Sequence, residues 1–261
     1  MFRLTDIPAW TVIAKGGVVF AWFALFFVAE RLAPAVQPLA PTGLPRLGRN
    51  GAFWLINTLL SPLIVLPMTG WAVAHRLYVR PEWWSGWSGL VLDVLLLDFL
   101  IYWWHRANHE WPLLWRFHEV HHLDRFLDST SAIRFHFGEV LLSAGARAAV
   151  VLLLGFPFAS IVLFESLLLC ATIFHHSNLR LPAGLERALS MAVIAPGIHW
   201  VHHHAARVDT DSNYGTLFSF WDRLFRTRSP TRRTPTMTIG VEGEGERALP
   251  MLLARPFRRT R

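Results

Sequence analysis

The sequence predicts an all-α fold: an integral membrane helical bundle of about four to five spans, with a cytoplasmic helical cap. Two features of composition predict it, because 53% of the 261 residues are hydrophobic and 16% are charged. A typical soluble domain has roughly 25% charged residues, so this chain has too few to cover a soluble surface. A third feature, long apolar segments separated by turn signals, predicts where the chain crosses the membrane.

Five apolar segments are predicted to span the membrane, where a helix needs ~20 mainly apolar residues. The third is short, and we expect it to continue as a helix beyond the bilayer. Gly155 and Pro157 separate the last two segments and predict a tight hairpin. The first segment is too long for the apolar region of a signal peptide, so we interpret it as a retained helix. The segments are residues 10–30, 52–74, 90–104, 139–155 and 156–174.

Two charged residues, Arg147 and Glu165, fall at membrane depth within this hairpin. Each lies about 12 Å along its helix from the turn, at 1.5 Å per residue. Charges inside a membrane usually pair, so we predict that antiparallel packing joins these two side chains. A structural ion pair is the simpler interpretation, and a role in substrate handling is the alternative.

Arginine supplies nearly all of the formal net charge of +7, since Lys15 is the only lysine. Such a charge suits nucleic acid or an anionic lipid surface. No nucleic-acid-binding motif accompanies it, and 13 tryptophans favour a membrane interface, so we expect no nucleic acid partner. The positive-inside rule then places the arginine-rich and histidine-rich side in the cytoplasm, in a protein of a bacterial inner membrane.

Twelve of the 13 histidines fall on this cytoplasmic side, the exception being His75, and most belong to three short motifs. The first motif, His105 and His109, continues the third span as a helix. Its i,i+4 spacing points both imidazoles the same way. Asp98 lies on the same stripe, seven residues before His105. We expect its carboxylate to accept a hydrogen bond from a ligand imidazole, which would fix the tautomer.

The second and third motifs share one spacing, with histidines at positions i, i+3 and i+4, which we expect to converge on one helical face. Pro112 precedes the second motif and predicts a turn after the first. His204 is rotated by about 100° beyond the third motif and is expected to lie off the cluster. The motifs are His118, His121 and His122, and then His199, His202 and His203.

Eight histidines exceed the four ligands of a structural zinc site, and they are enough for two metal ions with open positions. The cap is therefore predicted to hold a histidine-rich dimetal site. Imidazole binds Zn, Cu, Fe and Ni, so ligand type alone does not identify the metal. A histidine-rich divalent-metal transporter and a zinc-binding membrane protein are the alternatives. A transporter, however, would place its metal-binding residues near mid-bilayer.

The motifs and their surroundings resemble the fatty acid hydroxylase/sterol desaturase superfamily of membrane di-iron enzymes. The resemblance covers roughly residues 90–228. It departs from the family where no Pro follows His136 and where Arg226 replaces a common glycine. The matching text comprises Asp98 to His109, the second and third motifs, His175-His176-Ser-Asn178, Thr210-Asp211-Ser-Asn213-Tyr-Gly215 and Trp221-Asp222-Arg-Leu-Phe225.

The resemblance implies an oxygenase that uses O2 and two iron ions to hydroxylate or desaturate an unactivated C–H bond of a lipid. Zinc could substitute for iron in purified protein. Two electrons would come from an external donor, either cytochrome b5-like or ferredoxin-type. The eight motif histidines would be ligands and His176 a ninth, with His175 and His136 as candidate extra ligands. Asp211, Asn213 and Asp222 would either orient ligand imidazoles or cap loops.

Three parts of the chain are predicted from these observations. Residues 1–89 form N-terminal membrane helices, and residues 90–228 form a histidine-box catalytic domain that includes the membrane hairpin at 139–174. Residues 229–261 are rich in Arg, Thr, Pro and Glu with little periodicity. We expect this last part to be a basic, loosely ordered tail near lipid headgroups.

Overall fold

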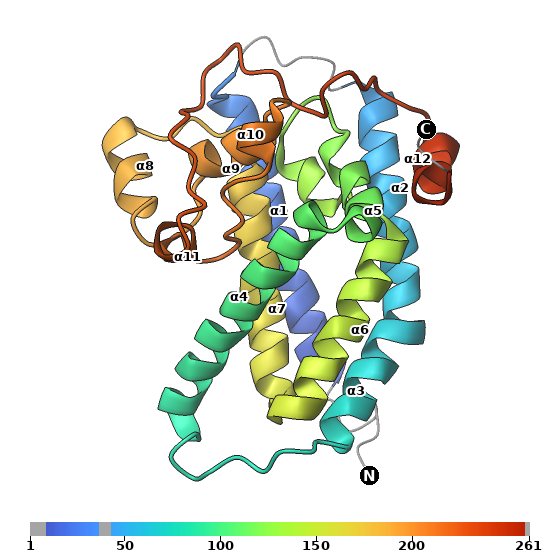
Figure 1. Ribbon diagram of the computed structural model, residues 1–261, viewed down its shortest axis with the longest axis vertical. Helices are drawn as coiled ribbons and strands as arrows, with labels where there is room; N and C mark the ends of the chain where they lie inside the picture. The colour runs from blue at the N-terminus through green and yellow to red at the C-terminus, as the bar shows by residue number, and fades with distance from the viewer. Residues whose placement is uncertain (1–8, 37–42, 259–261) are drawn as a thin grey trace.

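The computed structural model describes residues 9–36 and 43–258, with side chains from residue 15 onward, and the regular elements within these ranges are helices, with no extended strand. Long helices form a bundle, and shorter helices form a cap at one end of it (Figure 1). The predicted all-α class is confirmed. The bundle contains α1 (Ala9–Leu32), α2 (Leu44–Leu60), η2 (Ser61–Val65), α3 (Leu66–Ala74), α4 (Gly86–Glu110), α6 (Phe137–Leu154) and α7 (Phe158–His176).

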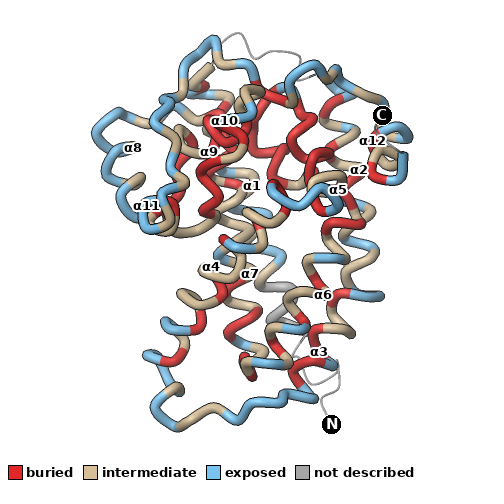
Figure 2. The backbone as a smooth tube through the Cα atoms, viewed as in Figure 1, coloured by how far each residue is buried: buried red, intermediate tan, exposed pale blue. Residues whose placement is uncertain are grey.

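The cap is built from short helices that follow or connect the long ones, and buried residues are concentrated in it (Figure 2). Isolated bridges, such as the one between His204 and Ile239, tie its loops together. Its elements are α5 (Pro112–His122), η3 (Ser129–Ile133), α8 (Ala183–Leu189), α9 (Pro196–His202), α10 (Arg207–Thr210), α11 (Phe220–Leu224), α12 (Leu249–Ala254) and η4 (Arg255–Phe257).

Four helices among the described residues are long and apolar enough to cross a membrane. Large apolar side chains on the long helices point outward, and Phe20 and Leu63 are more than 70% exposed. Helices with so much exposed apolar surface need hydrocarbon around them, so the chain is an integral membrane protein. The first predicted span corresponds to α1, whose earliest side chains lie outside the described residues. The four helices are Leu44–Ala74, Gly86–Glu110, Phe137–Leu154 and Phe158–His176.

The length of α4 explains how the first histidine motif reaches the cap. The helix has 25 residues, which makes it about 37 Å long against a hydrocarbon core of ~30 Å. Its last turns therefore extend past the bilayer, as predicted for the short third segment. Trp111 ends the helix and Pro112 begins α5, so the chain turns between the first two motifs as expected.

The predicted hairpin between α6 and α7 is present. Gly155 ends α6 with φ +68°, in the left-handed region that glycine adopts without strain. A side chain there would also lie 2.5 Å from the carbonyl oxygen of Tyr78. Beside this turn, Ala72, Ala148 and Phe156 are buried in the apolar core shared by α3, α4, α6 and α7.

The predicted intramembrane ion pair is confirmed, and a third charge joins it. Arg147 Nε lies 3.3 Å from Glu165 Oε1, and Lys15 Nζ of α1 lies 3.0 Å from Glu165 Oε2. The shared carboxylate connects α1, α6 and α7 at membrane depth. Pairing offsets the high cost of placing charged groups in hydrocarbon.

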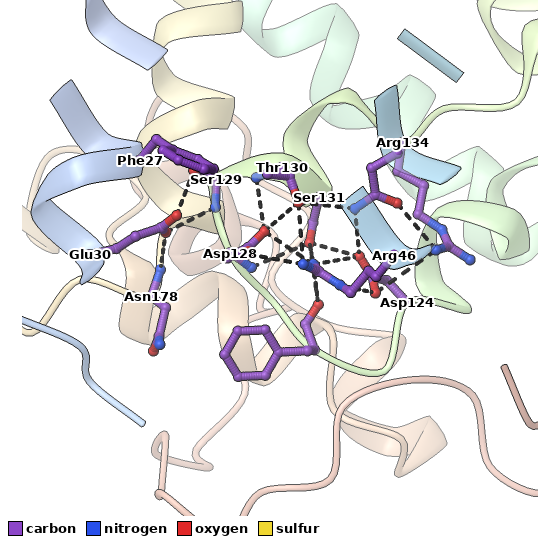
Figure 3. A network of polar contacts seen from close by, with 12 residues as sticks. Phe27, Glu30, Arg46, Asp124, Asp128, Ser129, Thr130, Ser131, Arg134 and Asn178 are labelled. Carbon is purple, nitrogen blue, oxygen red and sulfur yellow. Dashed lines mark hydrogen bonds and ion pairs between the residues drawn. The ribbon is translucent and has the colours of Figure 1, made fainter. Parts of the chain in front are cut away.

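A buried arginine in the first turn of α2 joins the bundle to the cap (Figure 3). Arg46 Nε and Nη2 each donate to the Asp124 carboxylate at 2.7 Å, and Nη1 donates to Asp128 at 2.9 Å. Burial alone would raise the pKa of Asp124, but the adjacent Arg46 and Arg134 outweigh it and lower the pKa to about 2. The loop that follows the second histidine motif is thereby attached to α2.

Glu30 of α1 provides a second connection in the same region (Figure 3). Its carboxylate accepts hydrogen bonds from the backbone N–H and hydroxyl of Ser129 and from the backbone N–H of Asn178. Asn178 follows His176 at the end of α7. One carboxylate therefore holds the loop after the second motif against the end of α7.

Part of the tail is more ordered than predicted, because its last segment forms α12 and η4 and packs on the cap. Leu252 of α12 is fully buried against Phe53 and Val120. Arg255 donates two 2.9 Å hydrogen bonds to Glu119, which lies within the second histidine motif. The few apolar residues of the tail are thus spaced to pack on the outer side of α5. The sequence did not predict this packing because apolar residues are sparse in the tail.

Replacing Arg46 with Ala should destabilise the protein by roughly 3–5 kcal/mol, because two buried carboxylates would lose their counter-ion. The measurement is thermal unfolding in detergent, followed by tryptophan fluorescence. Arg106→Ala is the matched control, because its ion pair with Glu110 is exposed and should contribute under about 1 kcal/mol. Equal unfolding temperatures for the two variants would contradict the proposed role of Arg46.

Candidate metal centre

The three histidine motifs lie on three cap-side helix ends. His105 and His109 occupy the last turns of α4, and the second motif forms the last turns of α5. The third motif lies on α9, which begins at Pro196 and ends at His202, with His203 as its C-terminal cap. His176 is the last residue of α7. The ends of four helices, α4, α5, α7 and α9, therefore converge in the cap.

The converging histidines form two groups, and in each group the ligand atoms lie within 4.8 Å of one another. All are buried, with at most 8% of any residue exposed. The nine members are the eight motif histidines and His176, the set proposed from the sequence and its family resemblance. One group contains His105, His109, His118, His122 and His202; the other contains His121, His176, His199 and His203.

Each of the second and third motifs is split between the two groups, contrary to the expected convergence on one face. His118 and His122 join the five-histidine group, whereas His121 joins the four-histidine group. In the third motif His199 and His203 stay together and His202 crosses over. At about 100° per residue, i and i+4 are only ~40° apart, whereas i+3 and i+4 differ by ~100°. One motif can therefore supply two adjacent metal positions.

Hydrogen bonds fix which ring nitrogen faces the interior of each group. A carbonyl or carboxylate oxygen only accepts from an imidazole, so its partner Nδ1 carries the proton and Nε2 keeps a lone pair. Five histidines are held in this way. The acceptors are Tyr214 O for His105 at 2.8 Å, Glu139 Oε1 for His118 at 2.7 Å, Arg134 O for His121 at 3.2 Å, Thr172 O for His176 at 2.8 Å and Ser212 O for His202 at 2.7 Å.

The Nε2 lone pairs of His121 and His176 face each other without a proton between them. His121 Nε2 and His176 Nε2 are 3.0 Å apart, although both rings carry their proton on Nδ1. His118 Nε2 and His202 Nε2 are buried with no hydrogen-bond partner. Such an arrangement is repulsive between neutral imidazoles, and a cation at the centre of each group would relieve it. The donor set fits metal ions, for which neutral imidazole is the commonest protein ligand.

Burial and neighbouring imidazoles keep these rings neutral. Burial lowers the pKa of His121 and His122 well below the usual value, and charge repulsion from His176 and His203 lowers it further. For His202, burial lowers the pKa to about 3, even though the bond to Ser212 opposes the shift. Unprotonated nitrogens are the form that binds metal.

The residues expected to orient ligands divide into one that contacts a histidine and three that act elsewhere. Asp211 Oδ1 lies 3.5 Å from His109 Nδ1, and neither atom has a hydrogen-bond partner. The expectation for Asp98 is wrong, because its carboxylate accepts from Thr216, the backbone N–H groups of Leu217 and Phe218, and Trp221. It anchors a cap loop rather than an imidazole.

Asn213 and Asp222 also act on loops rather than on imidazoles. Asn213 has φ +52°, and its side chain donates to Ile198 O and accepts from the N–H of Ser229. Asp222 accepts from the backbone N–H groups of Tyr214 and Gly215. It therefore positions Tyr214, whose carbonyl accepts from His105. Asp222 therefore acts on the histidine site indirectly, through Tyr214.

The remaining histidines lie outside both groups. His136 uses both ring nitrogens, since Nε2 bonds Leu253 O and Nδ1 accepts from the N–H of Gly138. His175 packs on His199 with ring centroids 4.0 Å apart but belongs to neither group. His204 bonds Asp209, off the cluster as expected.

Glu139 is the partner of His118 that sequence reasoning missed. It lies in the first turn of α6 and is 7% exposed. One feature of the sequence could have identified Glu139 as such a partner. A carboxylate at the start of an apolar span is costly unless another polar group pairs with it. The other acceptors are backbone carbonyls, which every residue type carries, so the sequence could not predict them. They belong to Arg134, Thr172, Ser212 and Tyr214.

A family profile described as fatty acid hydroxylase matches residues 90–227. The chain belongs to this family. The match spans α4 to α11 and so includes both histidine groups. Arg226, at the position where glycine is common, has φ +57°, a conformation that glycine adopts more readily.

Named relatives are lipid-modifying proteins. The chain is 27% identical to ornithine lipid hydroxylase OlsE of Rhizobium tropici, over 76% of this chain and 59% of the relative. It is 29% identical to alkylglycerol monooxygenase of Danio rerio, over 59% and 33%. It is 34% identical to a cholesterol 25-hydroxylase-like protein of Danio rerio, over 53% and 54%. The chain thus spans about a third to three-fifths of these relatives, and no solved structure matches it.

Removing the Glu139 carboxylate should weaken metal binding, because His118 would lose the acceptor that fixes its tautomer. We expect Glu139→Ala to bind iron or zinc about 10–100-fold less tightly. Glu139→Gln, which keeps an acceptor oxygen, should lose less. Metal content after dialysis against a graded chelator measures this, with Glu110→Gln, an exposed carboxylate on α4, as control. Unchanged retention in Glu139→Ala would contradict the role.

Acid should destabilise the metal-free protein. In the folded protein the pKa values of His121, His122 and His202 lie below the unfolded value of about 6.5, so the unfolded chain takes up protons first as the pH falls. The histidine contribution is fully present above pH ~6.5 and is lost as pH falls toward the folded values, about 3 for His202. Unfolding temperatures measured from about pH 7.5 down to about pH 5 should fall steadily. A constant temperature over this range would contradict the burial of neutral rings.

Proposed function

We propose that the protein is a membrane-bound non-haem di-iron oxygenase that hydroxylates an unactivated C–H bond of a lipid. The observation that carries the proposal is the pair of adjacent, fully buried imidazole groups with converging lone pairs. The overall reaction consumes the lipid, O2, two electrons and two protons, and yields the hydroxylated lipid and water. Relatives named as hydroxylases and monooxygenases favour hydroxylation over desaturation.

The nine histidines of the two groups are the proposed ligands of two iron ions. Bound iron would supply the activation of dioxygen and the removal of hydrogen from the C–H bond. Neutral imidazoles leave the full metal charge uncompensated at the site. The four-histidine group provides fewer ligands than the five-histidine group, so it is the position with more room for an exogenous ligand.

The protein residues contribute orientation and exclusion of water. Acceptors on Nδ1 hold the rings in one tautomer, and the oxygens of Glu139 and Asp211 are the charged neighbours of the five-histidine group. The four-histidine group has carbonyl acceptors in the corresponding positions. Carboxylate partners make imidazole a stronger donor, so the two metal positions are electronically different.

The lipid is proposed to approach the four-histidine group from the membrane side. Phe135 stacks on His121 with ring centroids 4.4 Å apart, and its ring is half-buried. Its carbonyl accepts from Asn57 of α2, a helix of the apolar bundle. Ornithine lipid, alkylglycerol and cholesterol appear in the names of the relatives. An acyl or alkyl chain of a membrane lipid is therefore the proposed substrate class.

The roles of the parts of the chain and its orientation in the membrane belong to the same proposal. Residues 1–89 would supply membrane helices and residues 90–228 the catalytic part. Arginine distribution supports a cytoplasmic cap in a bacterial inner membrane. An external one-electron donor, ferredoxin-type or cytochrome b5-like, would supply the electrons on that side.

Iron stoichiometry tests the proposal. Anaerobically purified protein should hold about two iron ions per chain. His105→Ala and His199→Ala each remove a ligand of a different group and should lower iron to about one and abolish lipid hydroxylation. Turnover is measured by mass spectrometry of lipids incubated with isotopically labelled dioxygen. His204→Gln, one residue beyond the third motif, is the control.

Three results would overturn the oxygenase. Retention of turnover in both alanine variants is one of them. Zinc without iron and without oxygen incorporation would support a zinc-binding membrane protein. Metal flux across vesicles containing the protein would support a transporter.

A further inference from the structure

The complete burial of the nine histidines raises the question of how electrons reach them, and the inference below rests on the proposed function. None of the nine residues is more than 8% exposed. A protein donor cannot touch any of these rings, so electrons must cross at least one other residue. The useful residues are those that contact a histidine ring on one side and approach the surface on the other.

Trp115 of α5 meets the first requirement. Its ring centroid lies 5.1 Å from that of His109, 5.4 Å from His122 and 6.3 Å from His118. All three belong to the five-histidine group. One indole therefore contacts three rings of a single metal position.

Trp115 also meets the second requirement, because it is half-buried and covered by a surface arginine. The Arg207 guanidinium carbon lies 4.5 Å above the indole ring, and the Arg207 side chain is 51% exposed. Arg207 also donates to His109 O at 3.1 Å and to Asp211 at 2.6 Å. The indole is thus held between the five-histidine group and an exposed charge on α10.

Other aromatic contacts with the histidines are less suitable. Among the described residues, Tyr214 is the second non-histidine ring against the five-histidine group, and it is 2% exposed. A route through it needs Tyr102 at 6.3 Å and then Trp103 at 5.6 Å before it reaches a ring that is 39% exposed. Phe135 contacts the four-histidine group instead. The path through Trp115 is shorter by two rings.

We propose that Trp115 is the residue through which electrons enter the metal centre, at a docking surface that includes Trp115 and Arg207. The partner that fits is a one-electron carrier protein with an acidic face, since the chain carries a net charge of +7 and Arg207, although paired with Asp211, keeps half of its side chain exposed. Each docking event would oxidise one reduced carrier and pass its electron through Trp115 to the metal that the histidines would hold. Two events would supply the two electrons of one turnover.

This proposal gives the two histidine groups different functions. Electrons arrive at the five-histidine group on the side of α5 and α10. The lipid approaches the four-histidine group on the side of Phe135 and α2. A protein donor in water and a substrate in the bilayer can then be present together without competing for one surface.

The test measures reduction of the iron-loaded oxidised enzyme by a reduced [2Fe–2S] ferredoxin in anaerobic stopped-flow mixing. Trp115→Leu should slow reduction at least about tenfold, which corresponds to ~1.4 kcal/mol in the barrier. Trp115→Phe should recover part of the rate because it keeps a ring. Trp111→Leu is the matched control, an exposed tryptophan four residues earlier with no ring contact to a histidine among the described residues. The wild-type rate should fall as salt is added.

Iron content and the resting spectrum accompany each rate and separate the outcomes. Equal reduction rates in Trp115→Leu and wild type, at equal iron content, would overturn the route while leaving the oxygenase intact. Slowing by Trp103→Leu rather than by Trp115→Leu would assign the route to Tyr214 and overturn the proposal. A wild-type rate independent of salt would overturn the acidic partner. Wild-type protein that holds no iron would overturn the oxygenase and the route together.

Discussion

Burial of nine imidazoles against one another is the constraint on which the rest of the structure depends. Each ring has two nitrogens, and a buried nitrogen without a partner is costly. The protein satisfies many outward-facing Nδ1 atoms with carbonyls or with Glu139, and it leaves Nε2 atoms facing inward. Hydrogen bonds made on the outer side of the site therefore leave ring nitrogens free to face its interior. Helix ends and loops must reach these acceptors, which explains why the cap is made of short, closely connected elements.

Several charged contacts hold those elements in place. Arg46 and Glu30 attach the loop after the second motif to α2, α1 and the end of α7, where His176 lies. Asp98 and Asp222 organise the loop that presents the Tyr214 carbonyl to His105. None of the carboxylates in these connections touches a motif histidine. Their function is to align segments that are far apart in sequence, so that rings from α4, α5, α7 and α9 meet.

The bundle and the cap differ in how they treat charge. Within the membrane, Lys15, Arg147 and Glu165 form a small paired cluster among apolar side chains. Where the bundle meets the cap, the buried Arg46 and Arg134 pair with buried carboxylates of other elements (Figure 3). Large exposed apolar residues lie along the long helices instead. The two histidine groups lie at the boundary between these two environments.

The sequence by itself determined the membrane helices, the hairpin at Gly155, the Arg147–Glu165 pair and which nine histidines converge. These follow from local composition, periodicity and spacing, or from motifs shared with a family. The tertiary structure decided how the nine divide, because the side on which His121 and His202 fall depends on how α5 and α9 face each other. It also decided that Asp98 anchors a loop, that Glu139 supports His118 and that the tail packs on α5. Those contacts join residues far apart in sequence. The side chains often bond to backbone carbonyls, which every residue carries, so the residue type does not predict the contact.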